Sequence, residues 1–499
     1  MLKRLICLIA VMLLLSSVNT AYAGSIGDEP GTPGKWFRGE EPTQIDESKP
    51  PLVFVHGINS SSSTWFDKND MAEQALRNGY ESAFIDLHPD QDMQKNGQLL
   101  AEKLKEIYEL FGRKLIVVGH SKGGIDTQAA LVHYDAHPYV AKVVTLGTPH
   151  YGTPLADLAY SKGGSWLAEI LGQKTAALYS LQTGLMAAFR SETDAKEMYP
   201  NKYVTYSGSE WGTFGSILYL GGMYLKSFGT NDGAVTVSST KLSYANNILT
   251  GKWDHYSIKN GTSIFPVIQN QLLASTTSKE DHEDIDDQIP STDLNTDLYV
   301  KGGNSEKNKK EEFYVEEGTE ELSIQWINKL KEDNLEIVAP NGDVLTKFTT
   351  TDASFPYNGA FSHHAQINKP VPGEWMIRST SGQEMPYLLL VSFDSPLSDE
   401  IKVMAAKTGN ASTHQSKLIK RLSKTVETVY FKDSKTKEKE KLSTHSSDSS
   451  QLSFKKEGAY SVTVNYTGLT ASGKSAFNRT IIRTVYVDHD GQIHGELPY

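Results

Sequence analysis

The segment from Lys114 to Gly124, KLIVVGHSKGG, constrains the fold of this chain more than any other stretch. Leu115 to Val118 is a short run of apolar, mostly β-branched residues, which predicts a buried strand. The residues from Ile125 to Tyr134 have helical spacing, so the residues between the two segments must turn sharply from strand to helix. A strand that leads directly into a helix favours an α/β architecture with a parallel sheet.

The turn itself, Gly119-His120-Ser121-Lys122-Gly123, fits the pattern G-x-S-x-G of a nucleophile elbow. Such a turn holds its serine in strained backbone geometry, and we expect Gly119 and Gly123 to supply the room. Ser121 would then lie at a helix N-terminus, where free N–H groups favour developing negative charge. The pentapeptide alone is a weak signal in a chain with 40 glycines, and its flanking strand and helix make it more specific.

The N-terminus has the pattern of a secretory signal peptide, residues 1–23. Lys3 and Arg4 precede an apolar run, and Ala21-Tyr22-Ala23 forms an A-x-A cleavage site. The alternative, a membrane anchor, is disfavoured because the apolar run is too short to span a bilayer comfortably. Cys7 is the only cysteine and lies inside this segment, so the mature chain has no disulfide, thiolate metal site or cysteine nucleophile. We therefore expect a secreted protein, extracellular or associated with the cell surface.

The charge of the chain limits its partners. The net charge of −11 argues against binding to nucleic acids and against electrostatic docking on anionic membranes. The length of 499 residues predicts two or three domains, and we expect a monomer.

Further strand and helix patterns extend the predicted sheet. Leu52 to Val55 is apolar and ends in His56-Gly57, and two later strands, 83–87 and 140–146, alternate with helical segments. In a parallel sheet, ligands bind at the carboxyl ends of the strands. At that edge the backbone N–H of Ile58, paired with that of Lys122, is our candidate oxyanion hole, and an ordinary turn glycine after His56 is the alternative.

Five motifs in order complete the pattern: VHGIN, GHSKGG, LGTPHYGTPLADL, GTNDGAV and WDH. Together they resemble the bacterial secreted lipase and esterase branch of the α/β-hydrolase family, over roughly Pro50 to Ser275. The resemblance implies a mostly parallel, doubly wound sheet with a helical lid or cap insertion. It also implies that Asp232, in the fourth motif, and His255, in the fifth, act with Ser121.

These three residues provide the chemistry of ester cleavage. Ser121 would attack the carbonyl, His255 would take its proton, and Asp232 would orient the imidazole. Their chain order, Ser, Asp, His, is that of α/β-hydrolases. Asp232 also fits a plain Asn-Asp-Gly turn, which leaves Asp86 and Asp254 as rival acids.

The resemblance has one departure, at Ser257. Calcium-dependent relatives carry a calcium-binding aspartate two residues after the catalytic histidine, and Ser257 occupies that position. We therefore expect no calcium, no other metal and no cofactor. The acidic run Asp281 to Asp287 is interpreted as a solvated linker rather than a metal site.

The remaining sequence predicts a lid and appended modules. Apolar residues at helical spacing predict two amphipathic helices within a lid insertion at about 153–200, with plain core helices as the alternative. The apolar stretch from Phe214 to Phe228 is a candidate pocket wall for an acyl chain. The predicted domains are a catalytic domain at 24–275, an acidic linker at 276–294, a β-sandwich at 295–396 and a second, immunoglobulin-like β-rich module at 397–499.

The sequence thus predicts a secreted serine carboxylester hydrolase, a lipase or esterase, that works through an acyl-enzyme. Its expected partner is an acyl ester or lipid, with contact to a lipid interface or a cell surface. Two alternatives stay open. One is an acyltransferase or thioesterase with the same triad, and the other is an inactive cell-surface binding protein, for which an eroded triad would be expected.

Overall fold

The structure is a computed structural model that describes residues 24–25, 31–194, 201–273, 296–305, 309–380, 382, 384–405, 416–434, 437–438 and 454–497. The predicted signal peptide, the acidic linker and the acidic run within that linker lie outside these residues, so the predictions for them stay untested.

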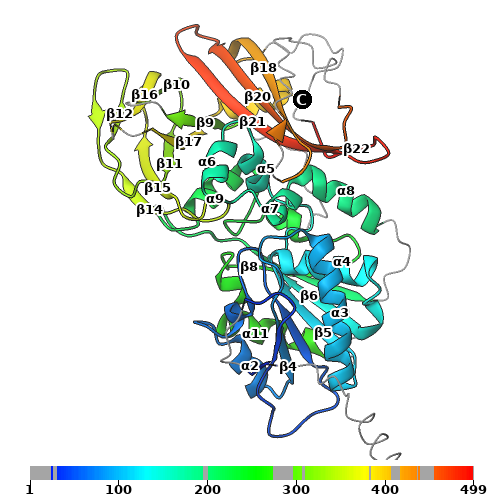
Figure 1. Ribbon diagram of the computed structural model, residues 1–499. Helices are drawn as coiled ribbons and strands as arrows, with labels where there is room; N and C mark the ends of the chain where they lie inside the picture. The colour runs from blue at the N-terminus through cyan, green and yellow to red at the C-terminus, as the bar shows by residue number, and fades with distance from the viewer. Residues whose placement is uncertain are drawn as a thin grey trace, which may run out of the picture.

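The N-terminal half is built on an eight-stranded sheet with the order β1-β2-β4-β3-β5-β6-β7-β8 (Figure 1). Strands from β4 to β8 pair in parallel, and β2 pairs antiparallel with β4. The strands are β1 Gly24–Ser25, β2 Trp36–Arg38, β3 Leu52–Val55, β4 Ser82–Ile85, β5 Leu115–His120, β6 Val140–Leu146, β7 Lys202–Gly208 and β8 Asn246–Gly251. The mostly parallel sheet of the predicted α/β-hydrolase fold is confirmed.

Helices cover both faces of this sheet because alternate strand residues point to opposite sides. Val53 and Val55 belong to the apolar cluster that α3 (Met93–Phe111) and α4 (Lys122–His133) complete on one face. Leu52 and Phe54 belong to the cluster with α2 (Met71–Arg77) and α11 (Gly261–Ile268) on the other face. The sheet is therefore doubly wound, and its two buried faces explain why its central strands are apolar throughout.

The region after β6 contains four helices where the sequence predicted two. They are α5 Pro154–Tyr160, α6 Ser165–Ile170, α7 Ala176–Ser180 and α8 Thr183–Asp194; α9, Tyr219–Leu225, follows β7. Their apolar residues share one buried cluster with residues of the C-terminal half, such as Tyr357, Leu388 and Ile482. These helices therefore join the catalytic half to the rest of the chain.

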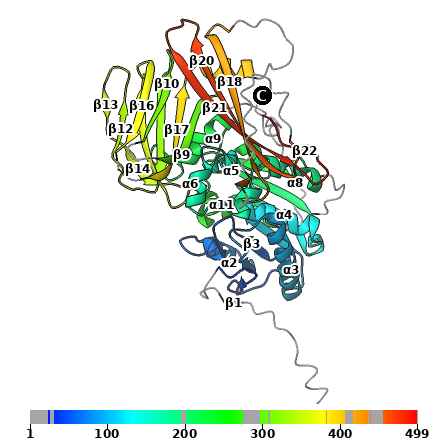
Figure 2. The same ribbon diagram turned by 45° about the horizontal axis from the view of Figure 1, so that its top comes forward.

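The C-terminal half consists of antiparallel sheets (Figure 2). Two of them, with the orders β10-β16-β12-β13 and β14-β15-β11-β17-β9, enclose a core in which the rings of Trp326 and Tyr387 stack at 4.5 Å. The third has the order β19-β18-β20-β21-β22, and α12 (Leu397–Ala405) contributes Leu397 and Ile401 to its core. The strands of the first two sheets are β9 Leu298–Ser305, β10 Lys310–Val315, β11 Glu321–Asn328, β12 Leu335–Val338, β13 Val344–Leu345, β14 Thr349–Asp352, β15 Phe361–Asn368, β16 Gly373–Ser379 and β17 Met385–Asp394. Those of the third are β18 Ile419–Phe431, β19 Lys437–Glu438, β20 Gly458–Thr470, β21 Ala476–Val487 and β22 Ile493–His494.

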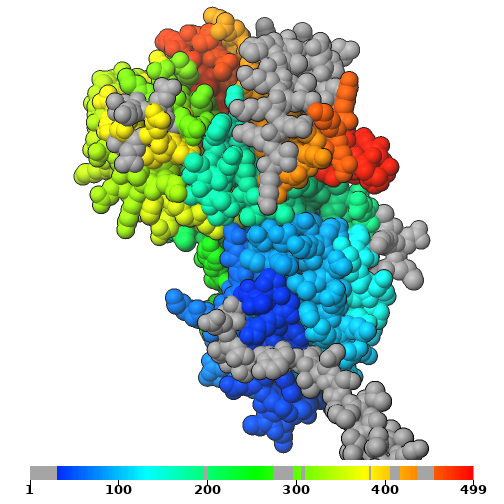
Figure 3. Space-filling model, viewed as in Figure 1, coloured from blue at the N-terminus to red at the C-terminus, as the bar shows by residue number. Residues whose placement is uncertain are grey.

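The two halves are in intimate contact (Figure 3). A Cβ atom on Gly302 of β9 would lie 2.2 Å from the carbonyl oxygen of Gly163, so the backbones of these two segments are in direct contact. Tyr179 of α7 donates its hydroxyl hydrogen to the carbonyl of Phe431 at 3.1 Å. Among the described helices, none is long and apolar enough to cross a membrane.

Candidate active site

Ser121 lies in the turn between β5 and α4, in a backbone conformation that few residues other than glycine adopt. Its φ of 52° falls in the positive region, as expected for a serine held in a strand-to-helix elbow. A Cβ on Gly119 would lie 2.8 Å from the backbone of Gly124, and one on Gly123 would lie 2.4 Å from the carbonyl oxygen of His56. The elbow therefore needs both glycines, as the sequence predicted.

Replacing Gly123 by alanine tests this packing. The new methyl group would overlap the His56 carbonyl, and overpacking of this kind costs about 1–3 kcal/mol, or a fall in Tm of roughly 3–10 °C. Calorimetry on the purified protein measures the effect. Gly303→Ala is the matched control, because its added Cβ has no atom within 4 Å. Equal Tm values for the two variants would contradict the packing argument.

The structure brings the three predicted site residues together. The Nε2 atom of His255 lies 3.1 Å from the Oγ atom of Ser121, and its Nδ1 atom lies 2.8 Å from the Oδ2 atom of Asp232. Ser121 and His255 are 134 residues apart in the chain. Ser121 follows β5 and His255 follows β8, and Asp232 packs at the end of β7, where a Cβ on Gly208 would lie 2.8 Å from its Cβ. This arrangement allows proton transfer from the hydroxyl to an oriented imidazole.

Asp232 is held so that one carboxylate oxygen faces His255. It is fully buried, and its Oδ1 atom accepts hydrogen bonds from the backbone N–H groups of Ala234 (3.0 Å) and Val235 (2.8 Å). The backbone N–H of His255 donates to the carbonyl of Asp232 at 2.9 Å, which ties the two loops together. The Asn-Asp-Gly turn, which alone suggested only a turn residue, thus also aims the second oxygen at the imidazole.

The rival acids have other partners. Asp86 is buried and accepts backbone hydrogen bonds from Gly31 and Ser62, both at 2.7 Å. Asp254 accepts hydrogen bonds from the backbone N–H groups of Tyr256 and Ser257 in its own turn. Neither carboxylate has a hydrogen bond to His255 in the described structure.

Two buried histidines support the site, and sequence reasoning assigned them no role. The Nε2 atom of His120 lies 2.8 Å from the carbonyl oxygen of His255, so this nitrogen must donate, and the two rings lie 4.8 Å apart. The Nε2 atom of His56 accepts from the backbone N–H of Leu87, so its Nδ1 donates to the carbonyl of Gly57. Burial lowers the pKa of both imidazoles, which keeps them neutral. In the sequence, only their positions directly before Gly57 and Ser121 could have indicated this supporting role.

The candidate oxyanion donors flank Ser121. Lys122 is the first residue of α4, so its N–H belongs to the helix N-terminal groups without an acceptor in their own helix. Its side chain is buried, where Nζ donates to Asp126 at 2.5 Å, so only its backbone can face a substrate. Ile58 lines the cavity at Ser121, and a Cβ on Gly57 would lie 2.8 Å from the Cβ of Ser121. The turn after β3 thus packs directly against the elbow.

Ser121 and His255 open into a cavity of about 280 Å³. One part of its wall is apolar, with Ile58, Leu181, Ala234 and Val235, and another part is polar, with Asn59, Ser60, Thr64 and Lys259. Phe355 and Asn358, from the loop before β15, also line it. The prediction that Phe214 to Phe228 form a pocket wall is wrong, because none of these residues lines the cavity. Phe214 and Tyr219 instead pack their rings against His364 of β15.

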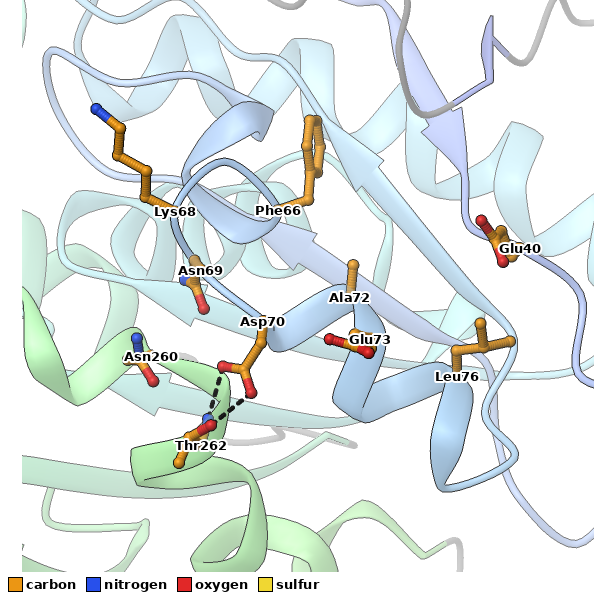
Figure 4. A pocket seen from close by; sticks show the side chains of 10 residues that line it. All are labelled: Glu40, Phe66, Lys68, Asn69, Asp70, Ala72, Glu73, Leu76, Asn260 and Thr262. Carbon is orange, nitrogen blue, oxygen red and sulfur yellow. Dashed lines mark hydrogen bonds between the residues drawn. The ribbon is translucent and has the colours of Figure 1, made fainter.

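A second, more open groove of about 790 Å³ lies elsewhere on the catalytic half (Figure 4). It contains no triad residue, and in it Asp70 accepts hydrogen bonds from the backbone and the hydroxyl of Thr262. Among the described residues, no group of three or more His, Cys, Asp or Glu side chains is placed to hold a metal ion. The expectation of a site free of metal and cofactor therefore stays a prediction.

The sheet, the elbow and the Ser121–His255–Asp232 arrangement define an α/β-hydrolase. Residues 50–162 match the family model of the PGAP1-like alpha/beta domain. The chain is similar to lipase BlEst2 of Bacillus licheniformis in its propeptide form, with 46% identity over 93% of this chain and 100% of that chain and a TM-score of 0.85. The mature form of that lipase matches 49% of this chain and all of its own length, with 59% identity and a TM-score of 0.47. The metagenomic carboxyl esterase MGS0156 matches 50% of this chain and 80% of its own, with 21% identity and a TM-score of 0.36. This chain therefore belongs to the α/β-hydrolase family, among its carboxylic ester hydrolases of the lipase and esterase type.

Proposed function

We propose that this protein is a secreted serine carboxylester hydrolase that cleaves acyl esters through an acyl-enzyme on Ser121. The observation that carries the proposal is the continuous chain of contacts from Ser121 Oγ to His255 Nε2 and from His255 Nδ1 to Asp232 Oδ2. Secretion is supported by the signal-peptide pattern of residues 1–23.

The proposed reaction uses the groups in a fixed order. Ser121 attacks the ester carbonyl while His255 takes the hydroxyl proton, and the N–H groups of Ile58 and Lys122 bind the oxyanion. His255 then gives that proton to the leaving alcohol, which leaves the acyl group on Ser121. A water molecule activated by His255 releases the acid. Loss of one oxyanion donor would cost about 3 kcal/mol of barrier.

Hydrolysis of p-nitrophenyl esters of graded acyl length by the purified protein tests this proposal. We expect turnover of the short esters, because the cavity has room for a short acyl chain on its apolar wall. No turnover above the background of heat-unfolded protein, either by the full-length chain or after limited proteolysis of its C-terminal modules, would contradict the proposal. Release of the same acyl group onto an added alcohol or amine faster than onto water would favour the acyltransferase alternative, and faster cleavage of matched thioesters would favour a thioesterase.

We propose further that this chain is a precursor and that its C-terminal modules restrict the site until they are removed. The lipase to which this chain is similar is described in a propeptide form, and that match includes both halves of this chain. All residues proposed for catalysis lie before residue 275, whereas Phe355 and Asn358 enter the cavity from the C-terminal half. The C-terminal modules thus contribute to the cavity wall and nothing to the triad.

Replacing Phe355 by alanine is expected to raise kcat/KM for a p-nitrophenyl octanoate several-fold, with a smaller effect on the acetate. The phenyl ring is part of the wall of a cavity of only about 280 Å³, so its loss makes room for a longer chain. Steady-state kinetics on both esters measure the change. Phe348→Ala, in the same module but packed on the sandwich core, is the control. A chain-length preference unchanged in Phe355→Ala would contradict this role.

A further inference from the structure

Of the described residues that line the active-site cavity, one is a lysine or arginine: Lys259, at the end of the short helix η4 (Ser257–Lys259). Lys259 lines the cavity together with Ser121 and His255, and its Nζ atom donates to the hydroxyl of Thr64 at 2.5 Å. Among the described residues it forms no ion pair with a carboxylate. Its Nζ atom also lies 5.9 Å from the centroid of the Tyr256 ring, so both partners of the ammonium group are neutral.

The surroundings of Lys259 do not compensate the positive charge of its ammonium group. Burial lowers the pKa of Lys259, and the more distant charge of Asp254 only partly offsets the effect. Asp254 Oδ1 is already engaged by two backbone N–H groups of its own turn. The nearby His120 is neutral, because burial lowers its pKa and the charge of Lys259 adds to that effect. A half-buried cation with no anionic partner is unfavourable, and one in a substrate cavity is a candidate for recognition of an anion.

The position of Lys259 indicates which part of a substrate it meets. His255 must deliver its proton to the leaving alcohol, so this alcohol lies beside the imidazole. Lys259 follows His255 by four residues and reaches across to Thr64 in η1 (Ser62–Trp65). The apolar residues Leu181 and Val235, by contrast, suit the acyl chain.

We infer that Lys259 is a specificity-determining residue that binds an anionic group, a phosphate or a carboxylate, on the alcohol part of the ester. The inference rests on the proposed ester hydrolase function and deepens it by naming a substrate class. The natural substrate is an acyl ester whose alcohol carries a negative charge. Nζ donates a hydrogen bond to an oxygen of that group, and the Coulomb attraction acts in a partly desolvated site, where it is stronger than in water.

Two matched substrate pairs test the inference on the full-length protein. Butyryl-glycerol 3-phosphate is compared with butyryl-glycerol, and butyryl 3-hydroxypropionate with the corresponding amide, by titrating the butyrate released. The quantity measured is the ratio of kcat/KM for the anionic ester to kcat/KM for its neutral partner. We expect Lys259→Met to lower this ratio at least tenfold and Lys259→Arg to lower it less than threefold. An effect in the phosphate pair alone, or in the carboxylate pair alone, supports the inference and identifies the anion.

Two control variants separate recognition from structure. Lys310→Met removes an exposed lysine at the start of β10, outside the catalytic half, so the ratio should stay within threefold of that of the wild-type protein. Lys202→Met removes an exposed lysine at the start of β7, at the opposite edge of the sheet, and should not change the ratio. A ratio unchanged in Lys259→Met, or lowered equally in Lys310→Met or Lys202→Met, would overturn the inference. If the wild-type protein hydrolyses neither the anionic nor the neutral esters, before or after limited proteolysis of its C-terminal modules, the proposed function itself fails.

Discussion

Replacing Ser121 by alanine is expected to lower kcat for p-nitrophenyl butyrate by about 10⁴-fold or more, which is the usual loss when a triad nucleophile is removed. The only hydroxyl bonded to His255 Nε2 in the described structure is that of Ser121, so no other nucleophile can replace it. The measurement is steady-state kinetics. Absorbance gives the protein concentration, and circular dichroism shows that the variant is folded.

Ser60→Ala is the matched control for this loss. Ser60 lines the same cavity, but its hydroxyl has no hydrogen bond to His255 in the described structure. Its variant should keep kcat within tenfold of the wild-type value. A Ser121→Ala variant that retains more than about a hundredth of the activity would be incompatible with an acyl-enzyme on this residue.

Replacing Asp232 by asparagine is expected to lower kcat by about 10⁴-fold through the tautomer of His255. Two backbone N–H groups hold the Oδ1 position, so the amide oxygen of the variant occupies it and the NH₂ group faces the imidazole. Nδ1 of His255 must then accept a hydrogen bond, which moves the ring proton to Nε2. In that tautomer the imidazole cannot take the proton of Ser121.

Asp254→Asn is the control for this second prediction. Asp254 is next to His255 in sequence and is also an aspartate, but in the described structure it accepts hydrogen bonds only within its own turn. We expect a loss of less than tenfold in kcat. A comparable loss of kcat in the two variants would mean that activity depends on negative charge near the imidazole and not on the orientation of the imidazole ring.

Local sequence patterns predicted the central sheet and the elbow because those patterns have local causes. The apolar run Leu115 to Val118 is buried on both faces of the sheet, and the glycines around Ser121 are required by contacts below 3 Å. The choice of Asp232 over Asp86 and Asp254 could not be made from spacing alone. It depends on which carboxylate the folded loops bring to Nδ1 of His255.

The helices after β6 and the cavity wall could not be predicted in full, because they depend on contacts between residues far apart in the sequence. Helical spacing predicted two helices after β6, but breaks near Gly163, Gly172 and Leu181 divide the segment into four. Phe214 to Phe228 is apolar because it packs on the C-terminal sandwich and not because it binds an acyl chain. Phe355 reaches the cavity from 234 residues beyond Ser121, and its sequence context is that of an ordinary loop between strands.

Covalent labelling of the full-length protein with a p-nitrophenyl alkylphosphonate, followed by peptide mass spectrometry, tests the proposed nucleophile most directly. The phosphonate reacts as the ester carbonyl does but stops at the covalent adduct, so it marks the activated hydroxyl. We expect one adduct per chain, located on Ser121, with labelling slowed strongly in Asp232→Asn. An adduct on another residue, or an unlabelled Ser121 in protein that hydrolyses esters, would contradict it.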